Sequence, residues 1–135
     1  MDLPSINDAI LACEALRQLG PEWVICTSAW QFEEWLHNIA VGPHGVVQVR
    51  VPFFADKNVV PKGTGDAFTA ILLGHYLDHG DIPAALSWAS AALHGLIQGS
   101  IDRYADELAV ISDRDQITSP NRISVSYTHL TLPTI

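Results

Sequence analysis

A short glycine-rich stretch followed directly by an apolar run constrains this chain more than any other feature. Residues 63–66 are Gly-Thr-Gly-Asp, and most of residues 67–73 are apolar. Glycines let the backbone turn tightly and let a ligand approach closely, because no Cβ stands in the way. The first turn of a helix offers unpaired N–H groups and the positive end of the helix dipole. The stretch therefore predicts a loop that leads into a buried helix and forms an anion site, most usefully for a phosphate.

The same stretch also has an ordinary structural interpretation. Glycine before a helix is common in loops, and an aspartate in a first turn, here Asp66, complements the helix dipole. A Gly-x-Gly pair alone is weak evidence for a phosphate site, because short motifs have many false positives. Spacing by itself leaves both interpretations open.

The full string over residues 63–68, Gly-Thr-Gly-Asp-Ala-Phe, resembles the signature of the ribokinase-like superfamily of sugar and vitamin kinases. Sugar kinases more often have alanine at the second position, so Thr64 makes the string more similar to that of pyridoxal kinases. Hydroxymethylpyrimidine kinases are similar too, but they have cysteine where this chain has Asp66. The resemblance runs from Pro4 to about Ile117 and corresponds to the C-terminal, nucleotide-binding part of such a kinase, less than half of a whole one.

The resemblance implies ATP-dependent phosphorylation of the 5′-hydroxymethyl group of pyridoxal, pyridoxine or pyridoxamine. It implies that the backbone N–H groups of Gly63, Thr64 and Gly65 hold the transferred phosphoryl group. Asp66 would contact the substrate hydroxyl and act as the catalytic base. Mg²⁺ is expected with ATP, and its protein ligands in the similar kinases lie largely upstream of this chain. The resemblance also implies a homodimer when full length, while a cytoplasmic location is the default expectation for a chain in which we expect neither signal peptide nor membrane span.

Two other functions stay open at this point. One is a sugar or nucleoside kinase of the same superfamily, against which Thr64 and the pyridoxal-kinase-like ending over residues 107–117 argue. The other is a truncated, non-catalytic fragment that at most binds a nucleotide, because the chain lacks the part that holds the acceptor in the similar kinases.

Composition and charge narrow the class of protein and its partners. The 135 residues include seven basic and fifteen acidic ones, which gives a net charge of −8, and 48% of the residues are hydrophobic. We therefore expect one domain with a sizeable core, and neither nucleic acid nor an anionic membrane as a partner. We expect no signal peptide and no membrane-spanning segment. Cys13 and Cys26 do not have a C-x-x-C spacing, so we expect two buried thiols.

Helix and strand patterns precede the glycine stretch. Ser5 and Asp8 suit a capping box for a helix that stops at Gly20-Pro21. The apolar run over residues 23–27 then predicts a buried, parallel strand that ends on Thr27 and Ser28.

Hydroxyl side chains at the end of this strand are candidates for nucleotide binding. Ligands collect beyond the carboxyl ends of strands in open parallel sheets. Pyridoxal kinases, which the chain resembles, place small hydroxyl residues near the nucleotide phosphates at this point, and this role carries over to Thr27 and Ser28. Both residues equally suit a strand end that caps the next segment.

The segments between Ser28 and the glycine stretch predict further elements. Residues 29–36 suit a short helical or irregular segment with Glu33 and Glu34 facing solvent. β-forming residues on both sides of positions 42–45, Gly-Pro-His-Gly, predict a hairpin. The loop that follows passes along adenine and ribose in the similar kinases, so Phe54 and Lys57 are expected to touch the nucleotide.

Two helices should follow the glycine stretch. The first runs from about Gly65 to Gly80, and the second is capped by Asp81 and carries Gly95 and Gly99, which allow close packing against a neighbour. Histidines 75 and 79 are four residues apart on the first helix, but we assign no metal site to them. A short strand over 107–111 and a short helix over 113–117 would end the domain.

The expected fold class is α/β: a partial ribokinase-like fold with helices layered on a mostly parallel sheet that includes a β-hairpin, truncated at the N-terminal side. Residues 1–118 would be the C-terminal part of the kinase domain. Residues 119–135 are expected to be a non-native or disordered tail, because 126–134 look like translated sequencing-adapter read-through.

Overall fold

The computed structural model describes residues 5–54, 61–102, 108, 110 and 113–120, together with the backbone of 126–130. The elements follow one another as α1 (Ile6–Arg17), β1 (Val24–Phe32), β2 (Trp35–Gly42), β3 (Gly45–Pro52), α2 (Thr64–His79), α3 (Ile82–Asp102), α4 (Asp115–Thr118) and β4 (Ser126–Leu130).

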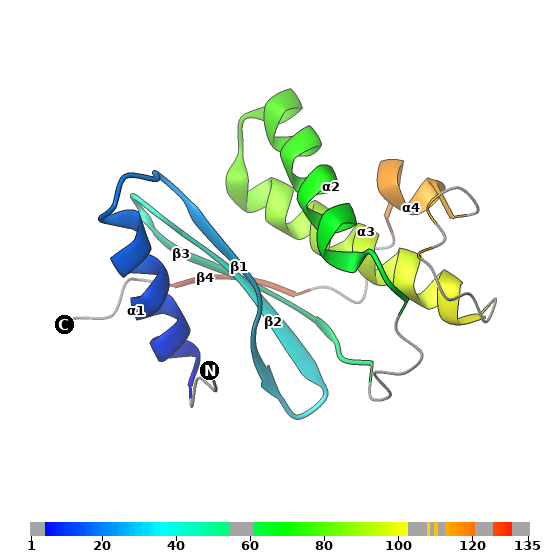
Figure 1. The fold of residues 1–135 in the computed structure, drawn as a ribbon, viewed down its shortest axis with the longest axis horizontal. Coiled ribbons are helices and arrows are strands. Elements are labelled where there is room, and N and C mark those ends of the chain that lie inside the picture. The colour runs from blue at the N-terminus through cyan, green and yellow to red at the C-terminus, as the bar shows by residue number, and fades with distance from the viewer. Residues whose placement is uncertain are drawn as a thin grey trace.

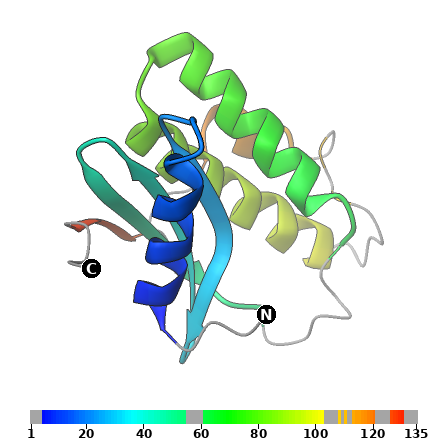
Figure 2. The same ribbon diagram turned by 60° about the vertical axis from the view of Figure 1, so that its left-hand side comes forward.

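The molecule has three layers, with the sheet in the middle. Neighbouring residues of a strand face opposite sides of a sheet. Ile39 and Val41 of β2 are buried in one cluster with residues of α1, whereas Ala40 between them is buried with residues of α2 and α3. In Figures 1 and 2 the sheet accordingly lies between α1 and the α2–α3 pair. This confirms the predicted layered α/β class.

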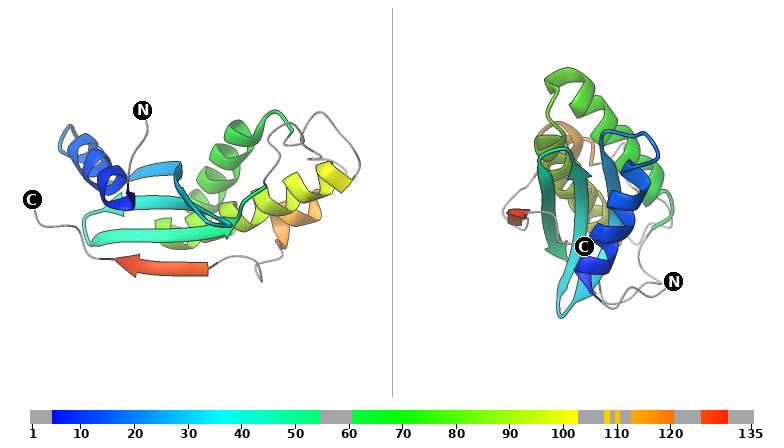
Figure 3. Two further views of the ribbon diagram at one scale, coloured as in Figure 1. Left: turned by 90° about the horizontal axis from the view of Figure 1, so that it is seen from below. Right: turned by 90° about the vertical axis from the view of Figure 1, so that its left-hand side faces the viewer.

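The strands of the sheet are arranged differently from the prediction. The order is β1-β2-β3-β4, and each neighbouring pair is antiparallel. The expectation of a mostly parallel sheet, including a parallel strand over 23–27, is therefore wrong for the described strands. An apolar run indicates burial but not direction, and β1 here turns directly back into β2. β1 and β4 are the two outer strands, and Figure 3 shows β4 along one edge.

The segment over 29–36 forms two strands and a turn, not the predicted helical or irregular segment. Glu33 and Glu34 are the exposed residues of the turn, and Phe32 pairs with Trp35 across it. Glu33 has a left-handed backbone with a φ of 55°. Asparagine, aspartate and glycine usually mark such turns, so a pair of glutamates gave no signal in the sequence.

The predicted hairpin at positions 42–45 is confirmed. Gly42 pairs with Gly45; β3 runs to Pro52, as its sequence allows, and β2 begins at Trp35, earlier than the sequence predicts. The ring of Trp23 lies flat against Gly42: a Cβ built there would come within 2.5 Å of ring carbons. Only glycine fits this position without a shift in the ring.

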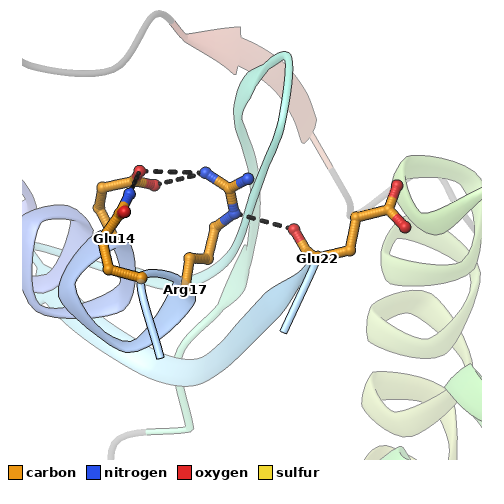
Figure 4. Close-up of polar contacts among 4 residues, drawn as sticks. Glu14, Arg17 and Glu22 are labelled. Atoms are coloured by element: carbon orange, nitrogen blue, oxygen red, sulfur yellow. Dashed lines mark hydrogen bonds and ion pairs between the residues drawn. The ribbon is translucent and has the colours of Figure 1, made fainter. Parts of the chain in front are cut away.

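Helix α1 begins and ends as its sequence suggests. Ser5 is the N-cap; its Oγ accepts the N–H of Asp8 at 3.4 Å and donates to the Asp8 carboxylate at 3.0 Å. The side-chain cap is confirmed, but the carboxylate accepts from the Ser5 hydroxyl instead of the Ser5 N–H that a capping box would use. At the other end, Arg17 pairs with Glu14 at 2.8 Å and donates from Nε to the carbonyl of Glu22 at 2.8 Å (Figure 4). This arginine links the end of α1 to the loop that enters β1.

The helices after the sheet also match the main sequence signals. Gly80 ends α2 with a φ of 71°, and the Asp81 carboxylate caps α3 by accepting the N–H of Ala84 at 3.1 Å. Gly95 and Gly99 give the predicted close approach, because added methyl groups there would overlap the side chains of Gln116 and Asp113. The α4 segment thus packs against α3.

The last predicted elements are only partly described. Helix α4 falls within the expected range, while Leu108 and Val110 of the predicted strand over 107–111 are not in a strand and its other residues lie outside the described part. Residues 126–130 form β4, which pairs with β3; the assignment of 119–135 as a non-native or disordered tail stays a prediction. Among the described helices, α3 included, none is both long and apolar enough to cross a membrane.

Replacing Gly42 with alanine should destabilise the chain by about 1–3 kcal/mol, because the new methyl group overpacks against Trp23. Gly74, inside α2, has open space around its Cβ position, so Gly74→Ala should be neutral or stabilising by about 0.5–1 kcal/mol. Urea unfolding of both variants checks the pair. Equal stability of the Gly42 variant and the unsubstituted chain would contradict the packing described here.

Candidate functional site

The start of α2 has no side-chain cap. Its N-cap is Gly63, which has a φ of 91° and no side chain to accept a helix N–H group. The helical hydrogen bonds begin with the N–H of Ala67, which donates to Gly63 at 3.1 Å. Within the described residues, the N–H groups of Gly63, Thr64 and Gly65 donate to no other protein group. The helix thus presents these amides and its positive dipole end to a ligand.

Asp66 lies in the first turn of α2 and is exposed to solvent, so its carboxylate does not point into the core. Together with Lys62 and Gly63 it lines an open hollow of about 490 Å³. Leu108 forms part of the same wall and donates its N–H to the carbonyl of Lys62 at 3.3 Å. The carboxylate therefore has room beside it for a substrate.

A second, more enclosed cavity of about 100 Å³ lies between the sheet and helices α2 and α3. Thr27, Ser28 and Phe54 line it from the sheet side, and Thr64 and Gly65 line it from the start of α2. Three of the four residues predicted to bind the nucleotide therefore share one cavity with part of the predicted phosphate site. The fourth, Lys57, lies outside the described residues.

Thr27 and Ser28 reach this cavity from the middle of β1, not from its end as predicted. Cys26 pairs with Ile39 and Trp30 pairs with His37, so the three residues between Cys26 and Trp30 face the single residue Asn38. The strand bulges there, and Ser28 has a left-handed backbone with a φ of 51°. A bulge redirects side chains out of the regular sheet pattern. No feature of the sequence distinguishes it from an ordinary strand end.

Two further residues of the cavity were missed in the sequence. His94 of α3 stacks on Phe54 with ring centroids 5.0 Å apart, and burial lowers the pKa of His94 below its usual value. Asn38 of β2 accepts the N–H of Ser28. For His94 a signal exists: Ser90 and His94 are polar residues four apart on a largely apolar helix, which places them on one face.

The described residues hold no group of three or more histidine, cysteine, aspartate or glutamate side chains that could bind a metal ion. His75 and His79 stack on one another with ring centroids 4.2 Å apart, and His75 also lies 4.9 Å from the Trp88 ring. These histidines share a face of α2, as the sequence suggested. The expected Mg²⁺ has no ligand set among the described residues.

The two cysteines meet at the contact between α1 and β1. Cys13 is buried, Cys26 is partly buried, and the two side chains are hydrogen-bonded to each other. The hydrogen bond from the Cys13 thiol lowers the pKa of Cys26 from 9.0 to about 7 and raises the pKa of Cys13. Cys26 immediately precedes Thr27 of the cavity. The expected burial is thus correct for Cys13 and only partial for Cys26.

Comparisons with known proteins agree on one fold. Among solved structures, a pyridoxal kinase from Trypanosoma brucei has a TM-score of 0.78 at 24% identity, covering 96% of this chain and 45% of that one. A pyridoxal kinase from Staphylococcus aureus in complex with ADP has a TM-score of 0.73 at 17% identity, covering 96% and 46%. The chain therefore shares the fold of the matching part of these pyridoxal kinases.

The sequence relatives are pyridoxal kinases. A pyridoxal kinase PdxY from Corynebacterium diphtheriae is 30% identical over 122 residues, which make up 88% of this chain and 41% of that protein. No protein-family model matches the chain. The resemblance inferred from the glycine stretch is confirmed, and the chain spans less than half the length of these kinases.

Cys26 should react with iodoacetamide with a half-point near pH 7, because only the thiolate is the nucleophile and its pKa is lowered to about 7. Cys13 should stay unmodified in the folded chain. In Cys13→Ala the hydrogen-bond donor is lost, the Cys26 pKa rises, and alkylation at pH 7 should slow roughly tenfold. Mass spectrometry of the two sites across pH measures this. A half-point for Cys26 above pH 8 in the unsubstituted chain would contradict the lowered pKa.

Proposed function

We propose that this chain is the ATP-binding and catalytic-base portion of a pyridoxal kinase. One observation carries the proposal: the uncapped, glycine-framed start of α2 lies between a cavity lined by hydroxyl residues and an exposed carboxylate. The reaction would transfer the terminal phosphoryl group of ATP to the 5′-hydroxymethyl group of pyridoxal, pyridoxine or pyridoxamine. The sequence relatives and the solved structure with bound ADP support this choice.

The N–H groups of Gly63, Thr64 and Gly65 would hold the phosphoryl oxygens. In phosphoryl transfer, negative charge spreads over these oxygens while the attacking and leaving oxygens lie roughly in line. Donors that are already oriented stabilise this charge without reorganisation. Backbone amides also suit this chain because its net charge of −8 would otherwise repel ATP.

Asp66 would take the proton of the attacking hydroxyl. As the hydroxyl oxygen bonds to phosphorus, the bond from phosphorus to the bridging oxygen of ADP breaks, and the hydroxyl proton moves to the carboxylate. Asp66 lies one residue after the amides and lines the hollow, whereas Thr64 and Gly65 line the cavity of Thr27 and Ser28. The acceptor would thus enter through the hollow and the nucleotide through the cavity.

The nucleotide would lie against Thr27, Ser28 and Phe54, with Lys57 as a further contact. Mg²⁺ would accompany ATP and take its protein ligands from outside the described residues. The complete kinase would be a cytoplasmic homodimer. A structure of the Staphylococcus aureus enzyme with AMP-PCP and pyridoxal supports ATP and a B6 vitamer as the pair of substrates.

A chain that binds ATP without turnover is the alternative function, since it spans only 41% of the Corynebacterium diphtheriae relative. Calorimetric titration with ATP followed by a turnover assay with pyridoxal separates the two. A panel of sugars and nucleosides in the same assay tests the remaining kinase activities. Failure to bind ATP would overturn both functions.

Gly65→Ala should weaken ATP binding by at least about tenfold without weakening the fold. The Cβ position of Gly65 has open space, and alanine favours helix, so stability should stay the same or rise by about 0.5–1 kcal/mol. The new methyl group, however, would occupy the approach of the phosphate. Titrations with ATP and with adenosine, with Gly74→Ala as the control, measure the effect. Equal losses for ATP and adenosine would contradict a phosphate site at these amides.

Asp66→Asn should lower kcat by about 10²–10⁴-fold in a form of the protein that phosphorylates pyridoxal, because the general base is lost. ATP affinity should change less than about twofold, since amides and not the carboxylate hold the phosphates. Steady-state kinetics and calorimetry on the same preparation check both values. Near-normal turnover by this variant would refute the role of Asp66. Asp78→Asn, an exposed change further along α2, is the matched control.

A further inference from the structure

One buried amide connects the two walls of the nucleotide cavity. Asn38 of β2 is 6% exposed and lies opposite the bulge in β1. Its Oδ1 accepts the N–H of Ser28 at 2.9 Å, and its Nδ2 donates to the hydroxyl of Ser90 at 3.1 Å. Ser90 belongs to α3 and is 2% exposed. The side chain therefore joins the sheet wall of the cavity to its helical wall.

The backbone of Ser28 needs such a partner. A φ of 51° is uncommon for a residue other than glycine, and such conformations persist only where the surroundings hold them. Ile39, the next residue of β2, and Ala40, which follows Asn38 on the same face of the strand, are fully buried and apolar. A buried polar side chain among them is costly unless it is hydrogen-bonded. The oxygen and the nitrogen of the Asn38 amide both form hydrogen bonds, and both partners, Ser28 and Ser90, line the cavity.

We propose that Asn38 is a positioning residue for nucleotide binding. It holds the Ser28 backbone in the left-handed conformation, which keeps Thr27 and Ser28 on the cavity wall across from Thr64 and Gly65. Ser90 in turn orients the Asn38 amide. This inference rests on the proposed function, because it assigns the cavity to the nucleotide of that reaction.

Asn38→Leu tests the inference, because leucine has a similar size but no hydrogen-bonding atoms. The 135-residue chain should bind ATP about tenfold more weakly with this change, and the Ser28 amide should exchange with solvent at least about tenfold faster. Calorimetry measures the affinity and NMR measures the exchange. Val46→Ala is the control: Val46 is fully buried on the opposite face of the sheet with α1 and does not line the cavity. It should lower stability while leaving both other readouts unchanged.

Ser90→Ala supplies a second, independent test. It should weaken ATP binding about threefold in the unsubstituted chain and have no further effect in Asn38→Leu, because Ser90 acts through Asn38. If the losses of ATP affinity from the two changes were additive, Ser90 would not act through Asn38. If Ser90→Ala leaves both ATP affinity and Ser28 exchange unchanged, the role of Ser90 is wrong.

The outcomes separate this inference from the proposed function. Normal ATP affinity in a folded Asn38→Leu chain would overturn the positioning role and leave the proposed function standing. Equal losses of affinity in Asn38→Leu and Val46→Ala would also overturn it, because general destabilisation would then account for both. No ATP binding by the unsubstituted chain would overturn the proposed function and the positioning role together.

Discussion

The structure depends on a helix start that the described part of the protein leaves unpaired. Relative to a serine or aspartate N-cap, Gly63 costs only about a few tenths of a kcal/mol, and glycine adopts its φ of 91° without strain. The cost is tolerable because Phe68 and Leu72 of α2 are buried against the sheet and α3. Packing along the helix thus holds the free amides in place, and the open end needs no stabilisation from its own loop.

The sheet and α3 form the cavity next to the start of α2. The antiparallel strands carry the bulge at Ser28, and α3 carries Ser90 and His94 on the face that meets it. Thr64 and Gly65 in the first turn of α2 line the cavity, and Gly63 and Asp66 beside them line the hollow. In the proposed reaction the nucleotide would lie in the cavity and the acceptor in the hollow, so the phosphoryl group would meet both at this turn.

Local signals in the sequence predicted much of the fold, but they could not predict which distant segments pair with one another. The cap at Ser5, the turn at Gly42, the cap at Asp81 and the glycine stretch each depend on a few adjacent residues. The direction of a strand relative to its neighbour depends on which distant segment it pairs with. The apolar run at 23–27 therefore predicted that the strand is buried, but not whether it is parallel or antiparallel. In the candidate site, a sequence motif predicted Asp66 and the backbone amides. Asn38 could not be predicted, because its role depends on the pairing of β2 with the bulged part of β1.

The bulge has a second consequence, for the outer rim of the sheet. β1 is an outer strand, so one side of its backbone has no partner among the described strands. Such rims attract other chains unless they are irregular or charged. The distortion at Ser28 breaks the regular row of donors and acceptors, and two glutamates sit at the tip of the strand. The feature that shapes the ligand cavity therefore also discourages neighbouring molecules from adding to the sheet.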